Sequence, residues 1–190
     1  MCNQLYSLFT HFKMEGKYVL ELGSGCGLAG LTLMLKGCRV TFTDLANVVD
    51  ELTHENVLST YRKFSTSPSL CLYKPDVHVL DWFEFSKNSN SSIRADTYAF
   101  LRNTYDYILL TDCIFSMEAT DYLIDTILKC SDSKTTIIIS YEIRDMDTNS
   151  YFLTQMQLYF SIKKIPENQF HQNYMNKLVQ ILFAKRNRKH

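Results

Sequence analysis

Two kinds of segment follow one another along this chain, short apolar runs and longer segments with an amphipathic period. The apolar or β-branched runs predict strands over 17–22, 39–43, 77–80, 105–111 and 135–141. The amphipathic segments predict helices over 28–36, 46–60 and 117–130. Strands that alternate with helices in this way predict an α/β fold with a doubly wound, mostly parallel sheet.

Both ends of the chain extend this pattern. Apolar residues at helical spacing predict an amphipathic helix over 3–13, and a second helix is expected at 149–160. Residues 161–165 and 178–184 predict an antiparallel strand pair that closes the sheet. The polar segments 62–75 and 86–97 are expected to be loops, and the alternation resumes after each. We therefore expect a single domain over 1–190.

Glycines are concentrated directly after the first predicted strand. All six lie between residues 16 and 37, and three follow the spacing G-x-G-x-G at Gly23, Gly25 and Gly27. Glycine permits sharp turns and close approach of the backbone to a ligand, so the loop predicts a pocket for a nucleotide-type cofactor. A dinucleotide loop would need glycine where Leu28 stands, and a phosphate loop of the Walker type would need Gly-Lys-Ser/Thr, which is absent.

A carboxylate follows the second predicted strand. In doubly wound sheets, ligands bind where the carboxyl ends of the strands meet. Asp44 is expected at that edge, 21 residues beyond Gly23, where its two oxygens can accept hydrogen bonds from both hydroxyls of a ribose. That role suits NAD and S-adenosylmethionine equally. The alternative is that Asp44 caps the next helix.

Composition restricts the partners. The 190 residues carry 20 basic and 20 acidic side chains, and no apolar run approaches the length of a membrane span. Neither nucleic acid nor a membrane is expected as a partner. None of the six cysteines forms a Cys-x-x-Cys pair, so we expect no zinc site and no disulfide. We expect a cytoplasmic protein, with the nucleus as a second location.

Several segments carry a family resemblance that covers nearly the whole chain. They are Leu20-Glu21-Leu22-Gly23-Ser24-Gly25, Thr43-Asp44-Leu45, Leu80-Asp81-Trp82, Asp106-Tyr107-Ile108-Leu109, Asp112-Cys113-Ile114-Phe115, Tyr141-Glu142-Ile143-Arg144 and Lys164-Ile165-Pro166. The chain resembles the class I, seven-β-strand protein lysine methyltransferases of the methyltransferase-like 21 group. Within that group, the likeness is to members that act on valosin-containing protein, an AAA ATPase.

The resemblance implies S-adenosylmethionine as cofactor and S-adenosylhomocysteine as product. The cofactor-binding residues it implies are Glu21, Gly23, Ser24, Gly25, Asp44, Trp82 and Thr111. By this likeness the glycine loop lines the methionine part, Asp44 binds the ribose, and Thr111 offers its backbone. Trp82 is expected beside the adenine, because a large flat side chain suits that contact. The alternative for Trp82 is packing in the core.

The resemblance places the reaction at Asp112 and Phe115. Asp112 begins the family's D-x-x-Y motif, and Phe115 replaces the tyrosine, which keeps the ring and removes the hydroxyl. Asp112 is expected to orient the amine of the substrate lysine, and Phe115 and Tyr141 to wall its channel. For Glu142, contact with the substrate and an ion pair with Arg144 both remain open.

One departure from the family concerns the start of the chain. Family members carry an N-terminal segment with a tryptophan that touches the cofactor, and this chain is expected to lack it, so weakened cofactor binding is expected. The implied partner is a protein substrate, an AAA ATPase of the valosin-containing protein type, with the enzyme itself a monomer. Two alternatives remain: a binding module with weak or no catalysis, and an NAD-linked or small-molecule enzyme.

Overall fold

The structure is a computed structural model that describes residues 13–87, 97–102, 104–169 and 176–187. Its strands are β1 (Tyr18–Leu22), β2 (Arg39–Asp44), β3 (Asp76–Val79), β4 (Tyr107–Thr111), β5 (Thr136–Glu142), β6 (Phe160–Lys164) and β7 (Val179–Arg186). Its α-helices are α2 (Leu28–Leu35), α3 (Ala46–Val48), α4 (His54–Phe64), α5 (Trp82–Lys87), α7 (Met117–Cys130) and α8 (Met146–Tyr159). A π-helix, η1 (Val49–Thr53), joins α3 to α4, and two 3-10 helices, η2 (Ala99–Arg102) and η3 (Glu167–Gln169), complete the described elements.

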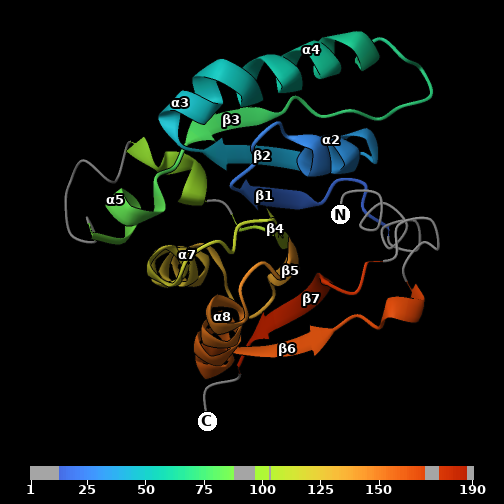
Figure 1. Cartoon of the computed structure of the whole chain (residues 1–190). Coiled ribbons are helices and arrows are strands. Elements are labelled where there is room, and N and C mark those ends of the chain that lie inside the picture. Colours follow the sequence, from blue (N-terminus) through green and yellow to red (C-terminus); the bar gives the residue numbers. More distant parts are fainter. Residues whose placement is uncertain (1–12, 88–96, 103, 170–175, 188–190) are drawn as a thin grey trace.

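The strands form one seven-stranded sheet in the order β3-β2-β1-β4-β5-β7-β6 (Figure 1). The first five are parallel, and β7 runs antiparallel to both β5 and β6. The predicted doubly wound sheet with a C-terminal antiparallel pair is therefore confirmed. The order turns back beside β1, so the ends of β1, β2 and β4 lie next to one another, which is where such folds bind ligands.

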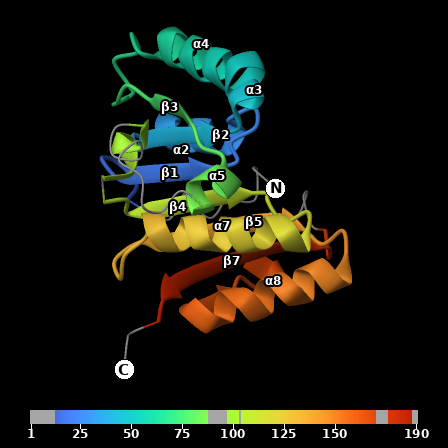
Figure 2. The same ribbon diagram turned by 90° about the vertical axis from the view of Figure 1, so that its left-hand side faces the viewer.

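Apolar side chains fill both faces of the sheet. Because neighbouring side chains of a strand point to opposite faces, Leu20 and Leu22 pack in one buried cluster and Val19 in the other. The first cluster includes residues of α5, α7 and α8, and the second includes residues of α2 and α4. Figure 2 shows α7 and α8 lying across one face of the sheet. Strands covered on both faces read as continuous apolar runs, as 105–111 does.

Some element boundaries differ from the prediction. The second helix continues to Phe64, into the segment expected to be a loop, and α5 was not predicted. Helix α8 begins at Met146, because the carboxylate of Asp145 accepts a hydrogen bond from the Thr148 amide at 2.7 Å and caps it. The helix expected at 3–13 lies outside the described residues except for its last position, and so does most of the 86–97 loop.

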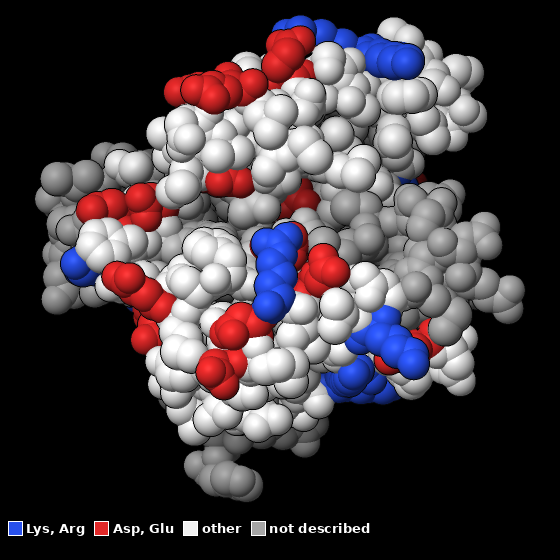
Figure 3. Space-filling model, in the orientation of Figure 1, with Lys and Arg blue, Asp and Glu red and all other residues white. Residues whose placement is uncertain are grey.

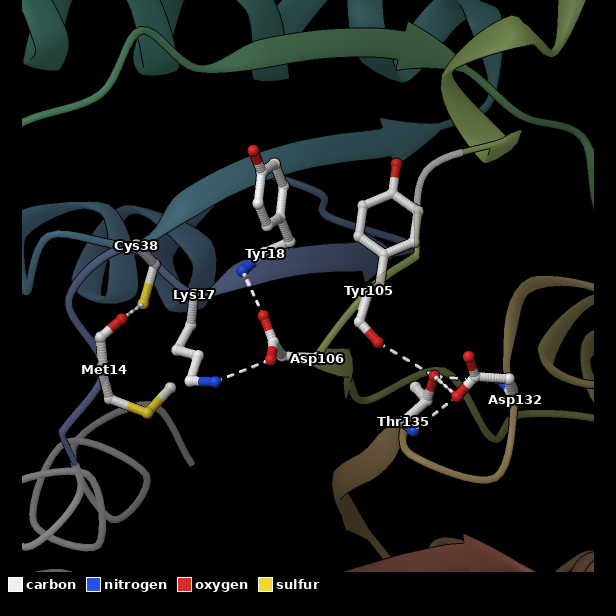
Figure 4. Close-up of polar contacts among 8 residues, drawn as sticks. All are labelled: Met14, Lys17, Tyr18, Cys38, Tyr105, Asp106, Asp132 and Thr135. Atoms are coloured by element: carbon white, nitrogen blue, oxygen red, sulfur yellow. Dashed lines mark hydrogen bonds and ion pairs between the residues drawn. The ribbon is translucent and has the colours of Figure 1, made fainter.

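Polar contacts join the strands at the amino ends of β1, β4 and β5 (Figure 4). Lys17 Nζ lies 2.8 Å from one carboxylate oxygen of Asp106. The second oxygen of this carboxylate accepts a hydrogen bond from the Tyr18 amide at 2.9 Å. Partial burial opposes ionisation of Asp106, but the Lys17 and Tyr18 contacts outweigh it, so the pKa of Asp106 is lowered. The Thr135 hydroxyl donates to the Tyr105 carbonyl at 2.9 Å. These contacts hold the end of the sheet that lies away from the glycine loop.

The cysteines within the described ranges, Cys26, Cys38, Cys71, Cys113 and Cys130, are all free, and Cys2 lies outside those ranges. Within the same ranges, no three His, Cys, Asp or Glu side chains are grouped so that they could hold a metal ion. None of the helices described has the length and hydrophobicity of a membrane span.

Candidate active site

A cavity of about 450 Å³ opens at the carboxyl ends of β1, β2 and β4, a volume typical of sites for small molecules. It is mostly apolar and includes five of the residues predicted to bind the cofactor and both predicted catalytic residues. Its lining residues are Gly23, Gly25, Asp44, Leu45, Val48, Leu80, Trp82, Phe83, Thr111, Asp112, Cys113, Phe115, Ala119 and Tyr122.

The glycine loop forms one wall in a backbone conformation that suits glycine. Gly23 and Gly25 have φ angles of 66° and 53°, in the left-handed region. A Cβ on Gly23 would lie 2.8 Å from Cys113 Sγ and 3.2 Å from a ring carbon of Trp82, whereas a Cβ on Gly25 would meet nothing within 4 Å. At Gly23, the missing side chain therefore leaves the cavity open.

Asp44 holds this loop against the end of β2. One carboxylate oxygen accepts from the Gly25 amide at 2.7 Å, and the other accepts from the Leu45 amide at 2.8 Å. The residue at the cap position of α3 is Leu45, with no side-chain cap, so the alternative that Asp44 caps that helix is wrong. The half-buried carboxylate keeps free lone pairs on the cavity.

Trp82 belongs to both the core and the cavity wall. Its side chain packs against the larger buried cluster and also lines the cavity, so the core-packing alternative holds, and its contact with adenine stays a prediction. Its indole Nε1 is buried and has no hydrogen-bond partner in the part of the chain described, although buried indole N–H groups normally find one.

Asp112 is placed by an unusual backbone conformation. Its φ angle is 61°, and among the described residues other than glycine no other φ is positive. Its amide donates to the Ser140 carbonyl at 2.8 Å, which ties the end of β4 to β5. Carboxylate oxygen Oδ2 pairs with Arg144, while Oδ1 is buried and has no partner among the described residues. Such conformations outside glycine cluster at functional sites.

Phe115 lies at the mouth of the cavity with 60% of its surface exposed. It stands between Ile114, which is buried, and Ser116, whose hydroxyl accepts from the Ala119 amide and caps α7. Single exposed rings are common on protein surfaces, so it is the position of Phe115 on the cavity, and not its exposure, that makes it a candidate contact for a ligand.

Two of the residues predicted to bind the cofactor, Glu21 and Ser24, do not line this cavity. Glu21 is fully buried, and its carboxyl accepts from the Gly30 amide at 3.0 Å. The Ser24 hydroxyl donates to the Thr43 carbonyl. Their contact with a cofactor stays a prediction, with both side chains placed behind the cavity wall.

Tyr141 does not line the main cavity. Its hydroxyl donates to Asn149 at 2.7 Å, and it lines a smaller neighbouring cavity together with Glu142, Arg144 and Phe115, so its part in the lysine channel stays a prediction. The alternative of a Glu142–Arg144 ion pair is wrong, because Arg144 pairs with Asp112. The described partner of Glu142 is the Asn176 amide, at 3.4 Å.

Several lining residues were not singled out in the sequence. Phe83 and Tyr122 meet edge to face, with ring centroids 5.0 Å apart, and form the wall between α5 and α7. Leu45 and Val48 lie on the opposite side, around α3. An unpredicted helix supplies Phe83, and the others lie on amphipathic segments whose period does not distinguish a core face from a pocket wall.

Gly30 fixes the contact between α2 and the sheet. An added Cβ would lie 2.4 Å from Glu21 Oε2 and 2.4 Å from a ring carbon of Phe42. We predict that Gly30→Ala lowers the free energy of unfolding by about 2 kcal/mol and the melting temperature by roughly 4–8 °C. Gly25→Ala is the control, because its Cβ has open space and only the left-handed φ costs energy, about 1 kcal/mol. Equal melting temperatures for Gly30→Ala and the unaltered protein would disprove the tight contact.

Comparison with known proteins agrees with this geometry. A family model described as lysine methyltransferase matches residues 2–159. The chain belongs to the lysine methyltransferase family. Two relatives are protein N-lysine methyltransferase METTL21A of Danio rerio, 30% identical over 155 residues, and EEF1A lysine methyltransferase 3 of Xenopus tropicalis, 27% identical over 155. These alignments cover 80% and 81% of the chain but 61% and 60% of the relatives. The chain thus spans about three fifths of their length.

Two solved structures share the fold of this lysine methyltransferase family member. Magnesium protoporphyrin IX methyltransferase from Synechocystis, with bound SAH, aligns with a TM-score of 0.62 at 12% identity, over 98% of this chain and 82% of that one. The PH0226 protein of Pyrococcus horikoshii aligns with a TM-score of 0.64 at 14% identity, over 97% and 88%. At these identities, the likeness concerns the fold alone.

Proposed function

We propose that this chain transfers a methyl group from S-adenosylmethionine to a lysine side chain of a non-histone protein. The observation that carries the proposal is the position of Asp112: its side chain lines the cavity formed by the glycine loop, and one of its carboxylate oxygens is buried without a partner among the described residues. Membership of the lysine methyltransferase family supports it.

The residues on the cavity fit this cofactor. Asp44 offers carboxylate oxygens to ribose hydroxyls, and Gly23 and Gly25 leave room for close approach of the amino acid part. Trp82 and Phe83 offer aromatic surface to the adenine. When bound, S-adenosylmethionine supplies a methyl group on a sulfonium sulfur, already activated for attack by an amine.

The protein's own part is to position the amine. A free lysine amine has a pKa of about 10.4, so it reaches the site mostly as ammonium. The exposed ring of Phe115 covers the lysine stem and attracts its charge, and removal from water favours the neutral amine. Asp112 accepts a hydrogen bond from the amine and directs its lone pair toward the reacting carbon, within the roughly 3–3.5 Å that attack requires.

The proposed substrate is an AAA ATPase of the valosin-containing protein type, presented on a basic segment. The family resemblance supports the protein class. Acidic side chains occupy the left and central part of the face in Figure 3. Glu142 and Asp145 line the smaller neighbouring cavity and have no basic partner among the described residues, so they favour a basic chain around the target lysine.

The test is tritium transfer from labelled S-adenosylmethionine to recombinant valosin-containing protein. We expect transfer to a lysine, identified by mass spectrometry, and a loss of at least about 100-fold in Asp112→Asn, because the neutral amide pairs weakly with Arg144 and accepts a weaker hydrogen bond from the amine than the charged carboxylate does. Binding of S-adenosylhomocysteine by Asp112→Asn should stay within threefold. The control is Asp50→Asn, an exposed acid of η1 away from the cavity, which should keep full activity. Methylation of another residue type, or equal rates with Asp112→Asn, would contradict the proposal.

A further inference from the structure

We propose that Arg144 is a positioning residue that holds Asp112 by one oxygen and balances its charge, so that the other oxygen receives the substrate amine. This inference rests on the proposed function and assigns a second residue to the same site. It concerns the junction of the two cavities, since Asp112 lines the larger one and Arg144 the smaller.

The ion pair is specific. Arg144 follows β5 and precedes α8, where three acids lie within three residues of it in sequence: Glu142, Asp145 and Asp147. Its guanidinium nevertheless pairs with Asp112 Oδ2, from the end of the neighbouring strand β4. Asp145 is occupied as the cap of α8, and the described contact of Glu142 is with Asn176.

The Asp112 side chain depends on this contact for its direction. The Asp112 backbone is fixed by the bond from its amide to the Ser140 carbonyl, but its carboxylate has no other described partner. With Oδ2 taken, Oδ1 remains buried without a donor, which is costly for a charged oxygen. Oδ1 has almost no accessible surface as the side chain stands, so an incoming amine would satisfy it after the carboxylate turns about its Cβ–Cγ bond toward the cavity.

Charge explains why a counter-ion is useful here. A lone carboxylate near an ammonium raises the pKa of that ammonium, whereas reaction needs the neutral amine. Arg144 offsets this effect of Asp112 while leaving Oδ1 free to accept. With Arg144 present, Asp112 can therefore orient the amine without stabilising the protonated form of that amine.

Among the other described ionisable groups around Asp112, none of those considered below supplies a positive charge that could replace Arg144. Burial raises the pKa of Glu21 on β1 to about 8, so it is largely neutral at pH 7. Burial also raises the pKa of the Cys113 thiol, which therefore stays protonated. Asp44 on β2 and the Tyr122 hydroxyl on α7 line the same cavity, and neither supplies a positive charge. Glu142 beside the smaller cavity is acidic as well.

The first experiment uses n-butylammonium, which has the stem and charge of a lysine side chain. Its binding is followed by the carbon-13 shift of the side-chain carbonyl carbon of residue 112, a carboxyl in the unaltered protein and an amide in Asp112→Asn, with and without S-adenosylhomocysteine. Removal of the guanidinium in Arg144→Met should tighten binding of this cation by roughly threefold to tenfold, because Asp112 loses its counter-ion. Arg144→Lys should stay within twofold of the unaltered protein, and Asp112→Asn should lose binding. Arg62→Met, at an exposed arginine on α4, is the matched control with no expected change.

The second readout is the pH dependence of methyl transfer to the protein substrate. In Arg144→Met the pH of half-maximal rate should rise by about one unit, because the amine holds its proton more strongly. Unchanged butylammonium affinity in Arg144→Met, with melting temperature preserved, would overturn the inference. The amine titration requires neither the protein substrate nor turnover, so this failure is distinct from absence of methylation in the unaltered enzyme, which would count against the proposed function.

Discussion

Asp44→Ala is expected to weaken binding of S-adenosylhomocysteine on the order of 1,000-fold. In the proposed complex, the carboxylate accepts hydrogen bonds from two ribose hydroxyls, and hydrogen bonds to a charged group contribute about 1.5–3 kcal/mol each. The same oxygens hold the glycine loop through the amides of Gly25 and Leu45. Removing the carboxylate therefore removes ligand contacts and frees the glycine loop, which forms one wall of the cavity.

Isothermal titration calorimetry with S-adenosylhomocysteine measures this loss. Asp50→Ala is the matched control, since Asp50 is an exposed acid only a few residues along the chain in η1. It should bind as the unaltered protein does. Asp44→Asn separates the two roles, because an amide oxygen can still accept from the Gly25 amide but carries no charge. Binding by Asp44→Ala within a few-fold of the unaltered protein would remove Asp44 from the ribose site.

Glu21→Gln is expected to remove a large pH dependence of stability. Glu21 has no exposed surface, and burial raises the pKa of its carboxyl to about 8, although bonds from Gly30 and Ser24 act in the opposite direction. Its Oε2 has no described partner, as suits a carboxyl that keeps its proton in the native state. The raised value belongs to the native state alone, so it links protonation to folding.

The direction of the pH dependence of stability follows from which state, native or unfolded, releases the Glu21 proton at the lower pH. Between the ordinary glutamate pKa of 4.5 and about 8, the unfolded chain is ionised while the native state still holds the proton. Native stability therefore falls as pH rises through this window and levels off above it. Over pH 5 to 8.5, the unaltered protein should lose on the order of 4 kcal/mol more than Glu21→Gln.

Urea unfolding at a series of pH values checks this difference. Other ionisable groups contribute equally to both proteins, so the difference isolates Glu21. Glu51→Gln, at an exposed glutamate of η1, should follow the unaltered protein at every pH. Parallel stability curves for Glu21→Gln and the unaltered protein would mean that Glu21 is ionised in the native state.

Much of the fold was predictable because its signals are local. The continuous apolar run before Thr111 is a parallel strand buried on both faces, and the helix over 117–130 was predicted with its observed bounds. Asp44 and Gly23 could be assigned to one cavity from the sequence alone, because the carboxyl ends of parallel strands meet at a common edge of the sheet. Strand order and family membership then agreed with that assignment.

Other features depend on contacts across the chain. The helix at Trp82 begins where Asp81 accepts from the Phe83 amide at 2.9 Å, in a segment too short to show a helical period. The partner of Arg144 lies 32 residues away on another strand, while acids nearby in sequence offered a simpler pairing. The orientation of Tyr141 away from the main cavity follows from Asn149, one turn into α8. Sequence spacing alone predicts none of these contacts.

The central claim is that the cavity beside the glycine loop holds S-adenosylmethionine, and the most direct measurement is a calorimetric comparison of cofactors. We expect S-adenosylhomocysteine to bind in a saturable, one-to-one manner, with affinity lost in Asp44→Ala, and NAD to give no saturable signal. Saturable binding of NAD with none of S-adenosylhomocysteine would contradict the account and would favour an NAD-linked enzyme on the same fold.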